Sequence, residues 1–383
     1  MKNIAFDYQV FAMQTYGGVS RYYFELCSRL QNLSNQEMNG RIVAPIHVNE
    51  YIQKLPQSQI DYFLRVNRFP GAWRFLQPFN QMMSRYKMAT NHTNLVHETF
   101  YCQQSVAPQN CPRVITVYDM LFEAQAKQSR AYQSMLQTKK KAIERADKVI
   151  CISASTKREL IQYLSVPESK ISTIHLGFEL SSAVPSFSAN TNTQVPINAE
   201  TNHNHLTAKP FLLHVGYRAG YKNFTNLLKA YAASDYLKNT FDLVTFGPNP
   251  FTRDESLHIE GLKLSDHVRQ VSGSDEKLIA HYQNAAAYIL PSTYEGFGIP
   301  LLEAMQFGCP VLCSDTTSMP EVAGNAACYF DPHSIDSMRS VIESTMQSTH
   351  LKDQKIQLGF ERVKQFSWNK CTLETINLYR QLL

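Results

Sequence analysis

Short apolar runs alternate with longer segments of helical periodicity along most of the chain. In the first half, the apolar runs predict strands at 2–6, 41–45, 94–97, 113–117, 148–152 and 171–174, and the periodic segments predict helices at 19–31, 127–146 and 156–164. In the second half, the runs predict strands at 211–215, 242–246, 268–271, 286–290, 310–313 and 327–330, with helices between them. This alternation is typical of βα units that form parallel sheets, so the chain is predicted to be α/β.

The alternation stops at residues 181–209, which are rich in Ser, Asn, Thr and Pro and contain few large apolar side chains. Such a composition buries little surface and is typical of a linker or a flexible insertion. A chain of 383 residues also exceeds the size at which one core usually keeps growing. We therefore predict two domains, 1–180 and 210–366, and a final helix at 367–383 that packs on one of them.

Local signals also mark helix ends. Thr156 and Glu159 have the spacing of a capping box, which predicts that the helix at 156–164 begins at this Thr. Pro300 suits the first position of a helix, and Gly308 suits its end.

The composition excludes some classes of protein. The apolar fraction of 44% and the charged fraction of 18% are those of a globular protein. A net charge of +5 is mildly basic and lacks the concentrated Lys/Arg pattern of nucleic-acid binding, so no nucleic-acid partner is expected. An anionic small molecule or a membrane surface fits this charge.

Three further features bear on location. The eight cysteines form no CxxC pair, which favours buried, reduced thiols over a zinc or redox site. The first residues read as a strand and not as a secretion signal. No apolar run reaches the roughly 20 residues of a membrane span. These features favour a cytoplasmic protein.

The richest chemical signal lies at 291–308, directly after the apolar strand at 286–290. This order places the segment at the carboxyl end of a parallel strand, where ligands of open α/β sheets bind. Gly296 and Gly298 allow unusual backbone angles and close approach of a ligand, and a helix is expected to start near Pro300. A glycine loop that feeds a helix start exposes unpaired N–H groups, so it is an anion site.

Two carboxylates flank this anion site. Glu295 lies in the loop, and Glu303 lies about one turn into the helix. Carboxylates beside an anion are understandable if they accept hydrogen bonds from hydroxyls on either side of it, as a sugar and a ribose would supply. The alternative is a solvated loop glutamate and a second one that complements the helix dipole.

Cations for a bound phosphate follow the strand at 211–215. Arg218 and Lys222 lie in the sequence Gly-Tyr-Arg-Ala-Gly-Tyr-Lys-Asn of residues 216–223, again at a carboxyl edge. Arginine grips phosphate oxygens in a bidentate manner, and lysine acts as a point charge. The alternative for these residues is a solvated loop of mixed charge.

Residues 294–305, Tyr-Glu-Gly-Phe-Gly-Ile-Pro-Leu-Leu-Glu-Ala-Met, resemble the E(x7)E motif of family 4 retaining glycosyltransferases, which have the GT-B fold. The resemblance implies two Rossmann-like domains that face a cleft, with the acceptor on the side of 1–180 and the nucleotide sugar on 210–366. It places Glu295 near the transferred sugar and Glu303 on the nucleotide ribose, and it assigns Arg218 and Lys222 to the donor diphosphate.

The resemblance extends to other positions. It adds Gly296, Phe297, Gly298 and Ile299 to the donor site, as well as Gly17 and Gly18 after the first strand and Ser272 near the nucleotide base. Members of the family often have a His where this chain has Tyr118. A tyrosine hydroxyl, with a pKa near 10, is a poor base at neutral pH. Tyr118, Asp119 and His97 are therefore candidates for the cleft only, and a lone histidine is more often structural.

The sequence contains no Asp-x-Asp triplet, so no metal-binding donor site and no cofactor are expected. The resemblance implies that the anomeric configuration is retained. The predicted donor is a nucleotide diphosphate sugar, GDP-mannose or a UDP-hexose. The predicted acceptor is a glycan or lipid-linked glycan of bacterial surface polysaccharide synthesis.

Residues 62–88 interleave aromatic and basic side chains. Three interpretations stay open: an interfacial helix that meets anionic lipid at the inner membrane face, a carbohydrate platform, and an ordinary helix with its aromatic side packed inward.

Three other classes of protein compete with the transferase. A nucleotide-sugar epimerase would convert the donor without any acceptor. A non-catalytic sugar-nucleotide sensor would bind the donor without turnover. A dehydrogenase is disfavoured, because no G-x-G-x-x-G follows the first strand.

Overall fold

The computed structural model describes residues 1–67, 72–124, 130–179 and 209–383, without the side-chain surroundings of 72–75 and 130–131. Contacts divide the chain into two compact units, which we describe separately. Unit 1 comprises Met1–Phe178 and Phe366–Leu383, and unit 2 comprises Glu179–Gln365. Apart from Lys209, the segment predicted as a linker at 181–209 lies outside the described residues.

Within the described residues, unit 1 contains a seven-stranded parallel sheet in the order β4-β2-β1-β6-β7-β8-β9. Its strands are β1 (Lys2–Phe6), β2 (Met38–Val43), β4 (Ile60–Asp61), β6 (Leu95–Glu98), β7 (Arg113–Val117), β8 (Lys148–Cys151) and β9 (Ile171–Thr173). A small second sheet pairs β3 (Ile46–His47) with β5 (Leu64–Arg65).

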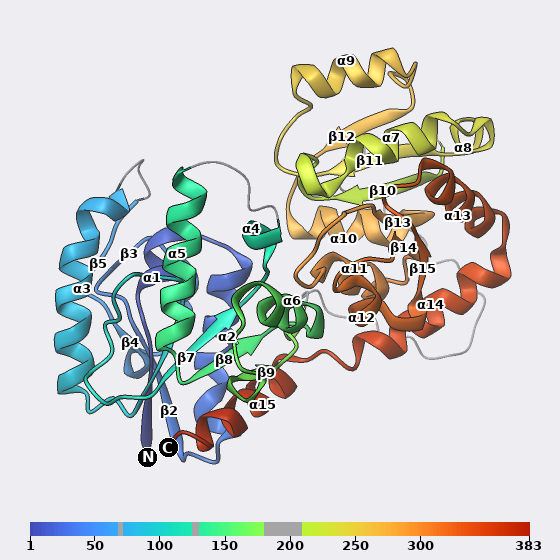
Figure 1. The fold of residues 1–383 in the computed structure, drawn as a ribbon. Helices are drawn as coiled ribbons and strands as arrows, with labels where there is room; N and C mark the ends of the chain where they lie inside the picture. Colours follow the sequence, from blue (N-terminus) through green and yellow to red (C-terminus); the bar gives the residue numbers. More distant parts are fainter. Residues whose placement is uncertain (68–71, 125–129, 180–208) are drawn as a thin grey trace, which may run out of the picture. The chain divides into compact units, whose positions relative to one another are not determined.

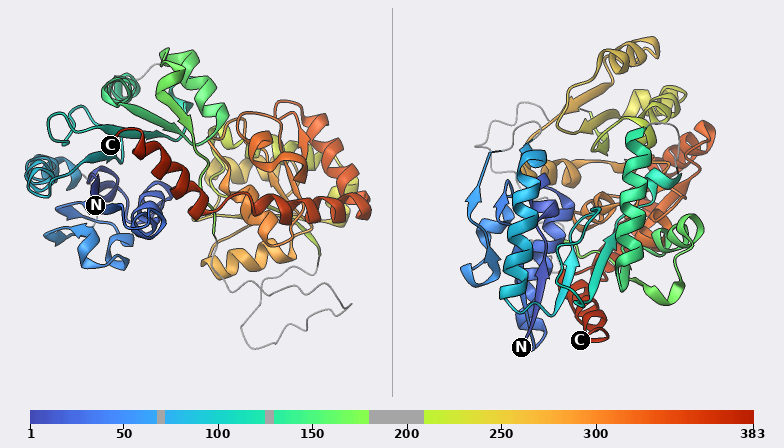
Figure 2. Two further views of the ribbon diagram at one scale, coloured as in Figure 1. Left: turned by 90° about the horizontal axis from the view of Figure 1, so that it is seen from below. Right: turned by 60° about the vertical axis from the view of Figure 1, so that its left-hand side comes forward.

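Helices cover both faces of the unit 1 sheet (Figure 1). They are α1 (Gln9–Met13), α2 (Gly18–Leu33), α3 (Ala72–Thr90), α4 (Leu121–Ala124), α5 (Arg130–Arg145), α6 (Ala154–Leu164) and α15 (Trp368–Arg380). The last of these comes from the end of the chain and packs against α2 (Figure 2). The rings of Tyr22 and Trp368 lie 6.3 Å apart in this contact.

Unit 2 repeats the architecture with a six-stranded parallel sheet in the order β12-β11-β10-β13-β14-β15. Its strands are β10 (Phe211–Val215), β11 (Asp242–Phe246), β12 (Val268–Val271), β13 (Ala287–Leu290), β14 (Val311–Ser314) and β15 (Ala327–Phe330). Its helices are α7 (Phe224–Ala232), α8 (Asp235–Thr240), α9 (Arg253–Gly261), α10 (Asp275–Asn284), α11 (Ile299–Gln306), α12 (Met319–Ala323), α13 (Ile335–Gln347) and α14 (Thr349–Val363).

The predicted α/β class with parallel sheets is confirmed, because every predicted strand forms within a few residues of its expected bounds. Apolar residues on alternate positions of β10, β11 and β13, such as Leu212, Leu243 and Ile289, are fully buried in one core with α7. Burial of these side chains, at about 25 cal/mol per Å² of apolar surface, is the main force that holds the layers together.

Two predictions of helix ends were wrong. Helix α6 begins at Ala154 and not at Thr156, because the hydroxyl of Ser153 caps it by accepting a hydrogen bond from the Thr156 backbone N–H. Pro300 occupies the second helical position of α11 and not the first. Gly308 does follow the end of that helix, with a left-handed φ of +69°.

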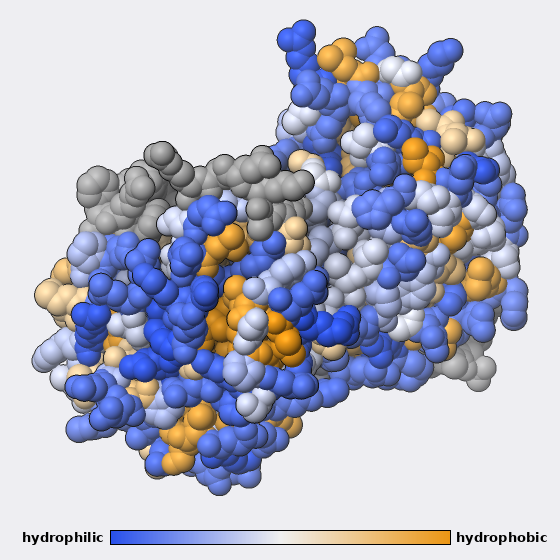
Figure 3. Space-filling view, in the orientation of Figure 1, coloured by the Kyte–Doolittle hydropathy of each residue, from blue (hydrophilic) through white to orange (hydrophobic). Residues whose placement is uncertain are grey.

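The surface in Figure 3 is largely hydrophilic, with scattered apolar patches. In the described part of the chain, no helix combines the length and the hydropathy that crossing a membrane requires.

Candidate functional site

The switch point of the unit 2 sheet lies between β10 and β13. From β10 the chain adds β11 and β12 on one side, and it then returns to add β13, β14 and β15 on the other. Ligands of open α/β sheets bind beyond the carboxyl ends of the strands at such a point. The two loops that start there contain Lys222 and Glu295.

These two predicted residues are in direct contact. The ammonium Nζ of Lys222 donates a hydrogen bond of 2.7 Å to Oε1 of Glu295. Both side chains are mostly buried, with exposed fractions of 19% and 13%. The pair thus places one cation and one carboxylate at the switch point, each still reached by solvent.

Hydrogen bonds to backbone carbonyl oxygens fix the two loops to each other. The N–H of Thr293 donates to the carbonyl oxygen of Tyr221 at 2.8 Å. The side-chain amide of Asn223, a residue with a left-handed φ of +59°, donates to the carbonyl oxygens of Pro291 and Pro332 at 3.0 and 2.8 Å. The separation of Lys222 and Glu295 is therefore set by rigid loop contacts as well as by their own ion pair.

The loop after β14 completes this arrangement, and sequence reasoning missed its role. Thr317 accepts a hydrogen bond of 3.1 Å from the N–H of Glu295, and Ser318 donates one of 2.8 Å to the carbonyl oxygen of Glu295. Thr317 adopts a left-handed φ of +53°, which is strained for a β-branched residue. Such strain at a site is a signal of function, although the sequence gives no sign of it.

The loop from Glu295 leads directly into helix α11. Gly298 caps the helix with a φ of +92°, and no side chain hydrogen-bonds at this cap. A Cβ added to Gly298 would lie 3.0 Å from the side chain of Leu301, so both conformation and space favour glycine here. Phe297 is buried beneath the loop, and Gly296 and Ile299 are partly exposed. The predicted glycine loop and helix start are therefore in place.

Glu303 is the fifth residue of α11. Its Oε2 accepts a hydrogen bond of 2.9 Å from the hydroxyl of Tyr282, which lies on α10. The predicted second carboxylate thus lies one turn into the helix that Gly298 opens. Tyr282 is a residue that sequence reasoning missed, because nothing in its neighbourhood in the sequence relates it to Glu303.

Arg218 differs from the expectation of a diphosphate contact. Its guanidinium donates to both oxygens of Glu255, at 2.8 and 3.1 Å, and to the carbonyl oxygens of Asn249 and Pro250, at 3.1 and 2.8 Å. It also stacks on Phe251 at 5.0 Å. In this structure Arg218 anchors the loop after β11, and a contact with a diphosphate would require it to exchange these hydrogen bonds.

The carboxylate of Glu255 is matched to this arginine. Partial burial opposes its ionisation, but the hydrogen bonds from Arg218 and from the Thr252 backbone hold the pKa of Glu255 below its usual value. The Glu255 carboxylate is therefore charged at neutral pH.

Ser272 lies at the rim of a cavity of about 560 Å³ beside β12. Its carbonyl oxygen accepts a hydrogen bond of 2.9 Å from Nζ of Lys277, and Phe211, Val244 and Val271 supply apolar lining. A largely apolar cavity with a polar rim fits a flat heterocycle, so the predicted base contact at Ser272 has a cavity beside it.

In unit 1 the predicted glycines open helix α2, with Gly17 at the cap and Gly18 as the first residue. The amide oxygen of Gln14 accepts a hydrogen bond of 3.1 Å from the N–H of Ser20. A Cβ on Gly17 would collide with the same oxygen. Glycine is thus needed so that the Gln14 side chain can cover the helix start, a contact that the sequence did not predict.

Tyr118 and Asp119 follow β7. Burial, with Tyr22 and Tyr23 nearby, raises the pKa of Tyr118 well above its usual value, so its hydroxyl stays protonated at neutral pH. A carboxylate oxygen of Asp119 accepts from the N–H of Leu121 at 3.2 Å. This bond supports the turn into α4.

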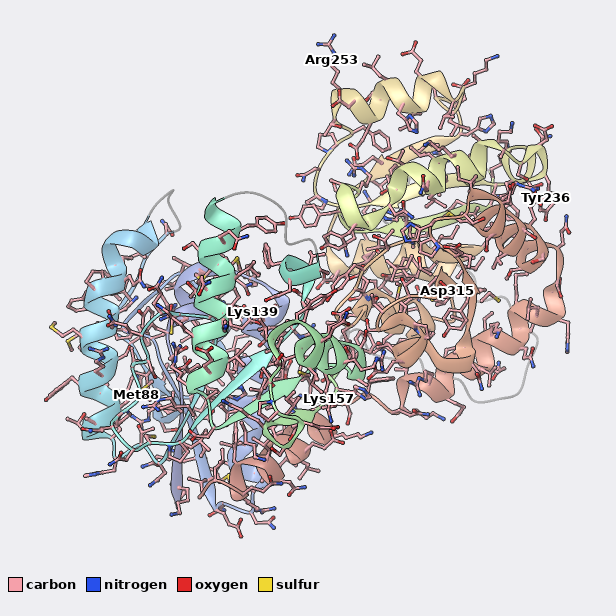
Figure 4. All side chains as sticks on the ribbon, viewed as in Figure 1. Met88, Lys139, Lys157, Tyr236, Arg253 and Asp315 are labelled. Carbon is pink, nitrogen blue, oxygen red and sulfur yellow. The ribbon has the colours of Figure 1, made fainter. Side chains whose placement is uncertain are left out.

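The Tyr118–Asp119 loop is held from beneath by a buried lysine. Nζ of Lys139, labelled in Figure 4, donates to the carbonyl oxygen of Asp119 at 2.6 Å and to Glu123 at 3.0 Å. The Lys139 side chain is only 2% exposed. Among the described residues, no group of three His, Cys, Asp or Glu side chains could hold a metal ion.

His97 was a candidate for the cleft, and the structure contradicts this. The side chain is fully buried, and its two ring nitrogens contact the hydroxyl of Tyr379 at 2.6 Å and that of Thr116 at 2.9 Å. Burial lowers the pKa of His97 to about 3, so the ring is neutral. His97 joins β6 to helix α15 and has a structural role.

Comparisons with known proteins match both units. The family described as Glycosyltransferase Family 4 matches residues 16–182, and the one described as Glycosyl transferases group 1 matches residues 198–360. The chain therefore belongs to the family 4 glycosyltransferases of the GT-B fold. It is 26% identical over 388 residues to the O-antigen chain mannosyltransferase B of Escherichia coli, a match that covers 95% of this chain and 96% of that protein.

A longer relative and two solved structures agree with this. The serotype-specific mannosyltransferase WbdA of Escherichia coli is 27% identical over 245 residues, which cover 63% of this chain and 29% of that protein. Sucrose-phosphate synthase from Thermosynechococcus elongatus has a TM-score of 0.73 at 19% identity, with 100% and 99% of the two chains covered. WaaG, a glycosyltransferase involved in lipopolysaccharide biosynthesis, has a TM-score of 0.70 at 14% identity, with 99% of each chain covered. These two structures show the fold.

Proposed function

We propose that this glycosyltransferase is a metal-independent, retaining hexosyltransferase. It would transfer a hexose from GDP-mannose or a UDP-hexose to a glycan or lipid-linked glycan in bacterial surface polysaccharide synthesis. Two relatives described as O-antigen or serotype-specific mannosyltransferases support a mannose donor. A structure of similar fold from Anabaena, HepE, contains UDP and glucose, which supports a nucleotide sugar as the donor.

The reaction would break the bond between the sugar C1 and the diphosphate oxygen and form a bond from C1 to the acceptor oxygen. Retention requires that the acceptor approach from the face that the diphosphate leaves. The proton of the acceptor hydroxyl would pass to the departing diphosphate, so no side chain has to act as the base.

The protein would stabilise the charge that develops on the diphosphate. Lys222 and the start of helix α11 at Gly298, where no side chain caps the helix, lie at the same switch point, and both favour an anion. Glu295 orients Lys222 through their 2.7 Å hydrogen bond and can accept hydrogen bonds from sugar hydroxyls. This contact between Lys222 and Glu295 is the observation that carries the proposal.

Replacement of Lys222 by Ala tests the proposal. We expect kcat to fall by about 10²–10³, the usual effect of removing one preorganised group that stabilises transition-state charge. Glu295→Gln keeps the shape of the side chain but removes the charge, and it should lower kcat as well. Lys364→Ala removes an exposed cation of unit 2 and is the control. Near-normal rates for both site variants would refute the proposal.

Three measurements test metal independence, retention of configuration and the need for an acceptor. Transfer should continue after removal of divalent metals by a chelator, and loss of activity that Mn²⁺ restores would disprove metal independence. The product should have the same anomeric configuration as the donor by NMR. Incubation of the donor alone should leave its sugar unchanged, which an epimerase would not do.

We also propose that part of residues 62–88 contacts an anionic membrane at the inner face. This segment contains five Arg or Lys residues and no Asp or Glu. Several large apolar side chains of the segment are exposed in the structure, and an exposed apolar set among cations suits an anionic lipid surface. They are Tyr62, Phe63, Leu64, Phe79, Met82 and Tyr86, with exposed fractions of 39% to 61%.

The membrane contact can be tested by sedimentation with vesicles. The protein should sediment with phosphatidylglycerol vesicles at low salt and less with phosphatidylcholine vesicles. Phe79→Ser combined with Met82→Ser should reduce sedimentation. Leu257→Ser, which changes an exposed apolar residue of unit 2, is the control. Equal sedimentation of all three proteins would count against a membrane contact through α3.

A further inference from the structure

A pair of buried tyrosines lies beneath the second carboxylate of the candidate site. Tyr282 on α10 is fully buried, and its hydroxyl donates to Oε2 of Glu303 at 2.9 Å. Its ring meets the ring of Tyr288 on β13 at 5.7 Å, nearly at right angles, and stacks on Phe307 at 6.4 Å. The Tyr282 hydroxyl is therefore held in place from two sides.

The hydroxyls of Tyr282 and Tyr288 differ in their hydrogen bonding. The Tyr282 hydroxyl has a carboxylate as its acceptor, whereas the equally buried Tyr288 hydroxyl has no hydrogen-bond partner. Burial raises the pKa values of both phenols well above the usual value, with Glu303 adding to the shift of Tyr282 and Glu295 and Glu303 to that of Tyr288. Both tyrosines thus stay protonated, and Tyr282 can act only as a donor toward Glu303.

The hydrogen bond from the neutral Tyr282 hydroxyl affects both the acceptor role and the orientation of Glu303. A hydrogen bond to a carboxylate stabilises its charged form, so Oε2 stays an acceptor. The bond also limits the rotation of the Glu303 side chain. Glu303 is partly exposed, so a ligand can reach this side chain while Tyr282 contacts it from the buried side.

We infer that Tyr282 is a positioning residue for donor recognition: its hydroxyl holds Glu303 as an oriented carboxylate for the hydroxyls of the nucleotide ribose. This inference rests on the proposed function and on the expectation, implied by the family resemblance, that Glu303 binds the nucleotide ribose. In this role Tyr282 does not touch the donor and acts through Glu303 alone.

Tyr282→Phe tests the inference, because it keeps the ring contacts with Tyr288 and Phe307 and removes only the hydroxyl. We expect the affinity for GDP or UDP, whichever the wild type binds, to fall about tenfold in calorimetry, the effect of one hydrogen bond to a charged group. KM for the donor should rise similarly while kcat stays within about twofold. Tyr288→Phe is the matched control, since it removes an unpartnered hydroxyl from the same cluster, and it should bind like the wild type.

Deoxyribose nucleotides separate positioning from a general structural effect. The 2′-deoxy and 3′-deoxy forms of the same diphosphate lack one hydroxyl each. With the form that lacks the hydroxyl bound by Glu303, Tyr282→Phe should cause little further loss, as in a double-mutant cycle. An equal tenfold loss with the ribonucleotide and both deoxy forms would mean a structural role and would overturn the inference.

Glu303→Gln separates the positioning role of Tyr282 from the ribose contact of Glu303. If Glu303→Gln weakens binding and Tyr282→Phe does not, the positioning inference fails and the proposed function stands. If neither Glu303→Gln nor the loss of either ribose hydroxyl weakens binding, the assignment of Glu303 to the ribose fails, and the proposed transfer reaction is unaffected. A wild type that binds neither GDP nor UDP would contradict both.

Discussion

A buried carboxyl at the switch point of the unit 1 sheet should make the stability of this unit depend on pH. Asp7 directly follows β1, and Thr99 directly follows β6, the neighbouring strand. Oδ1 of Asp7 accepts hydrogen bonds from the N–H and the hydroxyl of Thr99, at 2.8 and 2.5 Å. Oδ2 is buried without a hydrogen-bond partner. Burial, reinforced by the charge of Glu98, raises the pKa of Asp7 from 3.8 to about 7.

The direction of this pH dependence follows from proton binding. Because the folded state holds this proton more tightly than the unfolded state, the contribution of Asp7 is fully present below about pH 4 and is lost as pH rises through about 7. The shift of about three pH units corresponds to about 4 kcal/mol in total. Between about pH 5 and about pH 8 the loss should be about 2.5 kcal/mol.

Asp7→Asn should remove this dependence, because the amide oxygen can still accept from Thr99 and no proton is exchanged. Both tryptophans of the chain, Trp73 and Trp368, belong to unit 1, so urea unfolding followed by tryptophan fluorescence reports on this unit. The quantity to compare is the change in the free energy of unfolding between about pH 5 and about pH 8. The wild type should lose about 2.5 kcal/mol more than the variant over this range.

The comparison between wild type and variant matters because other buried groups titrate too. Burial lowers the pKa of His97 to about 3 and that of His47 to about 4, which makes stability rise with pH up to about 6.5 in both proteins. Glu144→Gln, at an exposed position of unit 1, is the control and should follow the wild type. If Asp7→Asn keeps the pH dependence of the wild type, the reasoning about Asp7 is refuted.

Three further predictions concern stability within each unit. Tyr379→Phe removes a partner of buried His97 and should lower the free energy of unfolding of unit 1 by about 1–3 kcal/mol in the same fluorescence assay, with donor KM unchanged. Gly298→Ala should destabilise unit 2 by about 1–3 kcal/mol in urea followed by circular dichroism, and should raise donor KM, because alanine is strained at a φ of +92°. Lys139→Met should cost unit 1 about 3–5 kcal/mol by leaving Glu123 buried and unpaired, and a second change of Glu123→Leu should restore most of it. Unchanged stability of any one single variant would contradict the stabilising role given to that residue.

Local patterns in the sequence determined the elements and the loops that follow them. Apolar runs predicted the strands because buried parallel strands need apolar side chains on both faces. Gly298, together with Pro300, predicted the helix start of α11, and its left-handed φ of +92° is one that few other residues adopt. The resemblance to the family was carried mainly by this segment and extended to other positions, and the comparisons confirmed the family.

Only the tertiary structure decided which side chains meet. Lys222 contacts Glu295 because the sheet order places β10 beside β13, and no local pattern specifies that order. Arg218 turns to Glu255, which lies 37 residues away, and His97 is buried by Tyr379, which lies 282 residues away. Sequence reasoning could name these side chains as polar groups near strand ends. It could not give their partners, because long-range packing fixes burial and hydrogen bonds.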